Sequence, residues 1–255
     1  MTLEGVRDVN HRPVELDPEL PIIFIDIDGV INSIPFEERW IGPERRTLST
    51  INDRNNWEYV RVESDNPEDY EIEREFLVTL NRDHYHHESR FGDPTKAPRG
   101  RELREAQAMI RVSEEMLEGL RTLVRERKAQ IVYLTWWRSE ALRVIEPEIN
   151  LGAVGYLDWN SESDLGHRAK LHALANLYEG FDMRNPFVVI DDEALKGIRD
   201  GYTNLWYVSP SAPNEAQERA LELNAIEHLY VEPDTRWGIN RMHMASIHGF
   251  IDSLA

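Results

Sequence analysis

The chain has 255 residues, of which 41% are hydrophobic and 30% are charged, a composition typical of a soluble globular protein. Its formal net charge of −18 argues against nonspecific nucleic-acid binding, which needs a basic surface. The absence of cysteine excludes disulfides, thiol nucleophiles and cysteine-ligated zinc.

Targeting signals are absent from the sequence pattern. No apolar run approaches the roughly 20 residues that span a bilayer, and the polar N-terminal segment lacks the apolar core of a signal peptide. We therefore expect a cytoplasmic protein that makes no membrane contact. The sequence gives no signal for a particular oligomeric state.

Four apolar runs predict buried parallel strands that end at polar residues. They are Ile22–Ile25 before Asp26, Ile131–Leu134 before Thr135, Phe187–Ile190 before Asp191, and Leu205–Val208 before Ser209. Helical periodicity lies between them: one helix is capped by Ser113, one runs from His167 to Tyr178, and a short one follows Asp192. The C-terminal part adds an apolar stretch, Glu227–Val231, and a last helix through Met242 and Leu254. This alternation predicts an α/β fold with a doubly wound, Rossmann-like, mostly parallel sheet and helices on both faces.

The stretch 33–100 interrupts the alternation and predicts an inserted β-hairpin flap, or small cap. Trp57–Val62 alternates like a strand, and we expect it to pair with Glu75–Leu80. Between residues 51 and 90 there are five arginines and no lysine against eleven acidic residues, a net charge of −6. Asp93–Gly100 has the composition of a linker that returns to the core.

Carboxylates follow two of the predicted strands. Asp26 and Asp28 leave the first strand on the same face, and Asp191 and Asp192 follow a later one. Because the carboxyl ends of parallel strands meet in one crevice, four carboxylates meeting there would need a hard cation such as Mg²⁺. The alternatives are a solvated acidic strand end for the first pair and helix N-capping for the second.

Two further side chains are candidates for contacting a phosphoryl group. Thr135 ends a predicted strand, where its hydroxyl can donate a hydrogen bond; the alternative is an ordinary turn stabilised by that hydroxyl. Lys170 lies early in a predicted helix, where it can offset the charge of a covalent intermediate; the alternative is a solvated surface lysine.

Together these residues resemble the four motifs of the haloacid dehalogenase superfamily of phosphohydrolases. The matching segments are Phe24–Val30, Val132–Thr135, Lys170 and Val188–Asp192, in the order expected along the chain. A closer likeness is to a small-cap branch grouped with RNA-repair-associated phosphatase domains, through Asp28–Asn32, Leu134–Trp137, Ile190–Glu193 and Glu232–Ile239. The resemblance implies one such domain over residues 1–255, with 33–100 as its flap or small cap.

The resemblance also implies a mechanism. Asp26 would be the nucleophile that forms an aspartyl-phosphate, and Asp28 would be the acid–base. Mg²⁺ would be held by Asp26, the backbone carbonyl of Asp28, and Asp191. Asp192 would hold a metal-bound water or orient Lys170. Thr135 and Lys170 would clamp the transferred group.

Substrate contacts are predicted less directly. Trp136 or Trp137 can stack on a base or ring, with core packing as the alternative for both. Arg138 can reach a phosphate, with a position on a helix surface as the alternative. A cluster of flap histidines, His84, His86 and His87, offers a second-metal site or a solvated loop.

Three functions follow as hypotheses. The first is a Mg²⁺-dependent phosphomonoesterase acting on a nucleotide or a nucleic-acid end, which rests on the likeness to the small-cap branch. The second is a phosphatase for a small metabolite such as a sugar phosphate, which the acidic flap favours because an acidic rim repels polyanions. The third is a catalytically silent binding module on the same fold.

Overall fold

The computed structural model describes residues 5–34, 36–40, 57–61, 63–81, 105–158, 168–180, 183–192 and 226–254. Several sequence predictions lie outside these residues: the strand Leu205–Val208, the short helix after Asp192, the linker Asp93–Gly100 and the histidines His84, His86 and His87. None of the helices in the described part of the chain combines the length and apolar character that crossing a bilayer requires.

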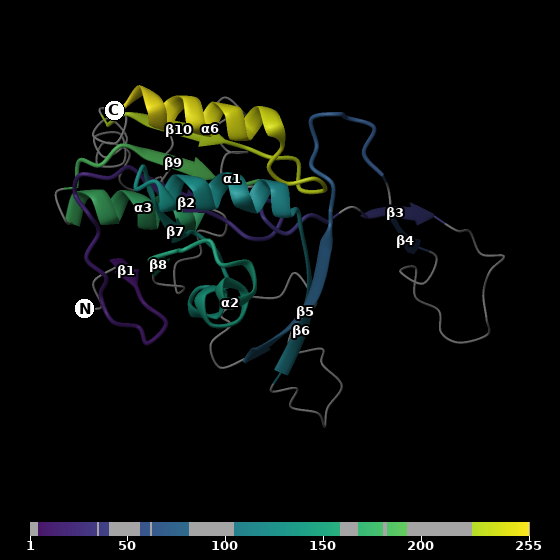
Figure 1. The fold of residues 1–255 in the computed structure, drawn as a ribbon. Coiled ribbons are helices and arrows are strands. Elements are labelled where there is room, and N and C mark those ends of the chain that lie inside the picture. Colours follow the sequence, from purple (N-terminus) through teal and green to yellow (C-terminus); the bar gives the residue numbers. More distant parts are fainter. Residues whose placement is uncertain are drawn as a thin grey trace, which may run out of the picture.

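The centre of the fold is a six-stranded sheet with the order β1-β8-β7-β2-β9-β10 (Figure 1). Its strands are β1 (Gly5–Arg7), β2 (Ile22–Ile25), β7 (Gln130–Tyr133), β8 (Gly155–Asp158), β9 (Phe187–Ile190) and β10 (His228–Val231). All neighbouring pairs are parallel except β1 and β8. Three of the predicted apolar runs and the apolar stretch near residue 230 are therefore confirmed as strands of one mostly parallel sheet.

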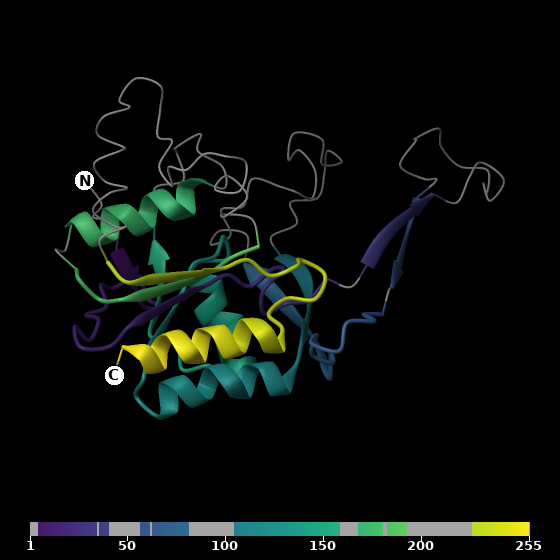
Figure 2. The ribbon, with the colours of Figure 1, turned by 90° about the horizontal axis from the view of Figure 1, so that it is seen from above.

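Helices cover both faces of this sheet (Figure 2). Helices α1 (Glu114–Arg125) and α6 (Arg241–Ser253) lie on one face, and α3 (Arg168–Gly180) lies on the other. The buried strand β2 serves both layers, because successive side chains of a strand point to opposite faces. Ile23 and Ile25 pack in the cluster that contains α1 and α6, whereas Ile22 and Phe24 pack in the cluster that contains α3.

The predicted helix after Ser113 is confirmed in detail. The Ser113 side chain accepts a hydrogen bond from the backbone N–H of Met116, 3.4 Å away, and so caps α1. After β7 the chain continues through a π-helical turn (Ala141–Ile145) into the short helix α2 (Glu146–Ile149).

In the residues that the structure describes, the insertion and the segment after it form two hairpins rather than one. Strand β3 (Phe36–Trp40) pairs with β4 (Trp57–Arg61), and β5 (Arg74–Asn81) pairs with β6 (Glu105–Val112), both antiparallel. The expected pairing of Trp57–Val62 with Glu75–Leu80 is therefore wrong, because each strand has a different partner.

The position of β6 explains the second pairing. β6 lies beyond residue 100, where the insertion was expected to end, and it leads directly into α1. Alternate residues of the β5–β6 hairpin, Val78, Ile110 and Val112, are buried in the core cluster with α1 and α6. In Figure 1 this hairpin lies beside the sheet, and β3–β4 lies beyond it.

Candidate functional site

The carboxyl ends of β2 and β9 bring two buried carboxylates together. The two strands are neighbours in the sheet, with Ile25 opposite Ile190, so the residues that follow them are adjacent. Asp26 donates its backbone N–H to the carbonyl oxygen of Ile190 at 3.0 Å. Asp26 is 6% exposed and Asp191 is fully buried. The parallel register thus places both side chains at the edge of the sheet where ligands bind in such folds.

Lys170 is the cation between these carboxylates. It lies in the first turn of α3 and is only 2% exposed, so the alternative of a solvated surface lysine is wrong. Its ammonium nitrogen makes ion pairs with Asp26 and with Asp191, the latter at 2.7 Å. Because an unpaired buried charge is very costly, this arrangement ties the end of the helix to both strands.

Burial and charge shift the pKa values of this group. Burial raises the pKa of Asp26 to about 7, an effect that the ammonium of Lys170 opposes and the carboxylate of Asp191 reinforces. Burial by itself would lower the pKa of Lys170, but Asp191 and Asp26 outweigh it and raise that pKa. The lysine therefore stays charged, whereas the Asp26 carboxyl holds a proton more readily than an exposed aspartate.

A third carboxylate completes a cluster that could hold a metal ion. Ligand atoms of Asp26, Asp191 and Asp192 all lie within 4.8 Å of one another, and all three residues are buried. Thr235 donates its hydroxyl to Oδ2 of Asp192 at 2.6 Å. Gly29 has a φ of +73°, and a Cβ there would lie 2.4 Å from the same Oδ2. The glycine and the threonine together fix where the Asp192 carboxylate can lie.

Asp28 is not one of these three carboxylates and has its own hydrogen-bond partners. It is half-buried, and both of its carboxylate oxygens accept hydrogen bonds. Asn32 donates its side-chain amide to Oδ1 at 2.9 Å, and Trp137 donates its indole N–H to Oδ2 at 2.8 Å. The sequence pattern predicts neither contact, although the segments Asp28–Asn32 and Leu134–Trp137 that provide them carry the resemblance.

The Thr135 hydroxyl stabilises a turn and can still donate a hydrogen bond. Thr135 follows β7, the strand on the other side of β2, and is 1% exposed. Its hydroxyl oxygen accepts the backbone N–H of Trp137 at 3.3 Å, so the turn that was the alternative interpretation is present. The hydroxyl proton is not used by that bond, because a hydroxyl both donates and accepts.

The three residues after Thr135 are the predicted candidates for substrate contacts. Trp136 is half-buried against the cluster that contains α3, and Trp137 is buried in the cluster that contains α1, so both pack against the core. Arg138 lies in a turn with a φ of +49° and is mostly buried, so its expected alternative on a helix surface is wrong. Its guanidinium is 3.6 Å from the carboxylate of Asp158, at the end of β8.

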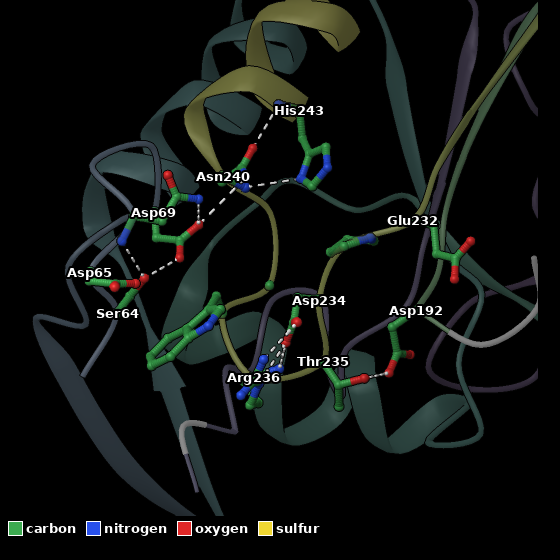
Figure 3. Close-up of a pocket in the computed structure, with 14 residues that line it drawn as sticks. Ser64, Asp65, Asp69, Asp192, Glu232, Asp234, Thr235, Arg236, Asn240 and His243 are labelled. Carbon is green, nitrogen blue, oxygen red and sulfur yellow. Dashed lines mark hydrogen bonds and ion pairs between the residues drawn. The ribbon is translucent and has the colours of Figure 1, made fainter. Parts of the chain in front are cut away.

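A cavity of about 730 Å³ opens beside Asp192 (Figure 3). It lies between the loop that precedes β5 and the loop that joins β10 to α6. Among the described residues that line the cavity, most of the charged side chains are acidic. The carboxylates are Asp65, Asp69, Asp192, Glu232 and Asp234, and the guanidinium is that of Arg236, which pairs with Asp234 at 3.2 Å. Among these residues, only Asp192 is a site residue predicted from the sequence.

Comparison of the chain with protein-family models, with curated proteins and with solved structures found no match in any of the three.

Proposed function

We propose that this chain is a Mg²⁺-dependent phosphomonoesterase that works through an aspartyl-phosphate on Asp26. The observation that carries the proposal is the buried group at the sheet edge, where Asp26 and Asp191 share Lys170 and Asp192 adds a third carboxylate. A doubly wound, haloacid dehalogenase-like fold is part of the same proposal. It is supported by the six-stranded sheet, by the helices on both faces, and by the chain order of the site residues.

The donor set fits a hard divalent cation. Three carboxylates and one ammonium leave a net charge of −2 in a buried group, which a divalent ion would neutralise. Carboxylate oxygens are the ligands that Mg²⁺ prefers. Asp26, Asp191 and Asp192 would hold the ion, with the backbone carbonyl of Asp28 as the fourth ligand that the resemblance implies. When bound, Mg²⁺ would neutralise phosphate charge and help to align the phosphoryl group.

The residues of the chain then have distinct roles. A carboxylate oxygen of Asp26 attacks phosphorus, and the bond from phosphorus to the leaving oxygen breaks as Asp28 gives that oxygen a proton. Water then attacks phosphorus in the aspartyl-phosphate and passes a proton to Asp28. The bond from phosphorus to the Asp26 oxygen breaks, so phosphate is released and the Asp26 carboxylate is restored. Lys170 offsets the negative charge on the transferred group, and Thr135 donates its free hydroxyl proton to a phosphoryl oxygen.

The substrate class is the part of the proposal with two versions. The sequence resemblance favours a nucleotide or a nucleic-acid end. The cavity beside Asp192 favours a small phosphorylated metabolite instead, because its described lining has five carboxylates against one guanidinium and would repel a polyanion. Trp136 and Arg138 remain candidates for contacts to the leaving group in either version.

The test is phosphate release from a panel of phosphomonoesters, with and without magnesium. The panel contains an aryl phosphate, nucleotides, oligonucleotides phosphorylated at either end, and sugar phosphates. We expect magnesium-dependent release that Asp26→Asn abolishes while its circular dichroism spectrum stays that of the wild type. Near-full activity in that variant would refute the mechanism. No release from any ester would favour a silent binding module, and a steep loss with salt would favour a nucleic-acid end.

A further inference from the structure

The Asp28 carboxylate is held on both sides by side chains with no role in the mechanism above. The indole N–H of Trp137 bonds Oδ2 and the side-chain amide of Asn32 bonds Oδ1, at 2.8 Å and 2.9 Å. Each carboxylate oxygen has two lone pairs, so one donor per oxygen fixes the plane of the group and leaves a position open on each oxygen.

Both donors are themselves rigidly held. Trp137 is 3% exposed within the core cluster, and its backbone N–H bonds the hydroxyl of Thr135. Asn32 donates its backbone N–H to the carbonyl of Ile27 at 2.7 Å. The side-chain oxygen of Asn32 accepts the backbone N–H of Arg111, on β6, at 2.8 Å. The position of Asp28 is therefore tied to the β2–β7 sheet edge on one side and to the β5–β6 hairpin on the other.

We propose that Trp137 and Asn32 are positioning residues that hold Asp28 for proton transfer to the leaving oxygen. This inference rests on the proposed phosphatase function. The proton leaves a carboxyl oxygen of Asp28 and goes to the leaving oxygen as its bond to phosphorus breaks and the bond from Asp26 to phosphorus forms. A carboxyl group without its two donors rotates about its Cβ–Cγ bond, so the proton is less often within reach of that oxygen.

The readout is the dependence on the leaving group. An alkoxide needs a proton to depart, whereas a nitrophenolate departs without one, so only the alkyl ester depends on Asp28 as an acid. We would measure kcat/KM with 4-nitrophenyl phosphate and with 2-phenylethyl phosphate, since kcat/KM covers the steps up to departure of the leaving group. General acid catalysis accelerates such reactions about 10²–10⁴-fold. Trp137→Phe removes part of the geometry that this step needs, so we expect it to lower kcat/KM for 2-phenylethyl phosphate about 10-fold or more.

In Trp137→Phe we expect kcat/KM for 4-nitrophenyl phosphate to fall far less than kcat/KM for 2-phenylethyl phosphate. Asn32→Ala gives the same selective loss and serves as the test if Trp137→Phe does not fold. In an Asp28→Asn background, Trp137→Phe is expected to add no further loss with the alkyl ester.

A matched control is Tyr133→Phe. It also removes one hydrogen bond between a buried aromatic residue and a carboxylate, because the Tyr133 hydroxyl donates to Glu146 at 2.6 Å. It does not contact Asp28, so the ratio of the aryl to the alkyl value is expected to stay that of the wild type.

A second readout does not need activity. The indole ¹H–¹⁵N resonance of Trp137, assigned by its loss in Trp137→Phe, is expected to move in Asp28→Asn. An unmoved resonance would overturn the positioning role. Equal losses with both esters in an active Trp137→Phe protein would also overturn it, and would leave the proposed function standing. A wild-type protein that releases phosphate from neither ester would overturn the proposed function, and the positioning role with it.

Discussion

Replacing Lys170 by methionine tests whether the buried carboxylates depend on a cation. The substitution keeps most of the side-chain volume and removes the ammonium that pairs with Asp26 and Asp191. Removing one partner of a buried ion pair costs about 3–5 kcal/mol of unfolding free energy. For a chain of this size that corresponds to a fall in Tm of roughly 6–20 °C.

The assay is thermal unfolding in a chelator and again in millimolar magnesium. The charge on Asp26, Asp191 and Asp192 is no longer offset in Lys170→Met, so magnesium is expected to raise its Tm more than that of the wild type. Burial raises the pKa of Asp26 even though Lys170 lowers it, so without the lysine this carboxyl can take up a proton that replaces the lysine in part. The loss in chelator is therefore expected to be larger at alkaline pH than at mildly acidic pH.

A surface lysine provides the matched control. Lys128 pairs with Asp252 at 2.9 Å but is solvent-exposed, so Lys128→Met is expected to keep a Tm near that of the wild type. A Lys170→Met protein whose Tm in chelator is also near that of the wild type would refute the reasoning, because the carboxylates would then need no internal cation.

Three further substitutions test neighbouring features. Gly29→Ala places a Cβ 2.4 Å from Oδ2 of Asp192 at a φ of +73°, so we expect about 1–2 kcal/mol of destabilisation and a smaller rise in Tm with magnesium. The control Gly249→Ala lies in open space on α6 and is expected instead to stabilise the protein by about 0.5–1 kcal/mol. A similar loss of stability in both variants would contradict this reasoning. Thr235→Val removes the hydrogen bond to Asp192, so we expect the free energy of unfolding to fall by about 1 kcal/mol and calorimetry to show weaker magnesium binding. Unchanged binding would show that the threonine does not orient the Asp192 carboxylate. Burial lowers the pKa of His243, which accepts a hydrogen bond at the start of α6. As pH falls, the unfolded chain therefore takes up a proton on this histidine before the folded chain does. The folded protein is expected to lose stability as pH falls below the ordinary histidine pKa. His243→Gln should lose less stability than the wild type over that range in urea titrations, and an equal loss would assign the pH dependence elsewhere.

The parts of the site that the sequence predicted are those that depend on local pattern and on parallel topology. An apolar run that ends in an acid marks a strand end, and adjacent parallel strands bring such ends together, so Asp26 and Asp191 could be placed without a structure. Lys170 was identified as a candidate, but its burial between the two carboxylates was not, because helical periodicity does not place a helix end against a sheet edge.

The parts that the sequence did not predict depend on the choice of partner. Alternation marked Trp57–Val62 and Glu75–Leu80 as strands, but a strand pattern does not name the strand it pairs with. Each has a neighbour elsewhere, β3 for the first and β6 for the second. The contacts of Trp137 with Asp28 and of Thr235 with Asp192 likewise join segments far apart in the chain. They depend on how the loops after β7 and β10 return to the sheet edge.

The distances along the chain that the site spans bear on how it is formed. Lys170 and Asp26 are 144 residues apart, Trp137 and Asp28 are 109 apart, and the bond between Ser33 and the carbonyl of Trp237 spans 204 residues. Contacts of high contact order form slowly, because the entropy of closing long loops is lost before the contact forms. The backbone hydrogen bonds of a helix such as α1 join residues close in the chain, whereas the carboxylate group requires β2, α3 and β9 to have assembled. Recovery of the site after denaturation should therefore follow recovery of helical structure.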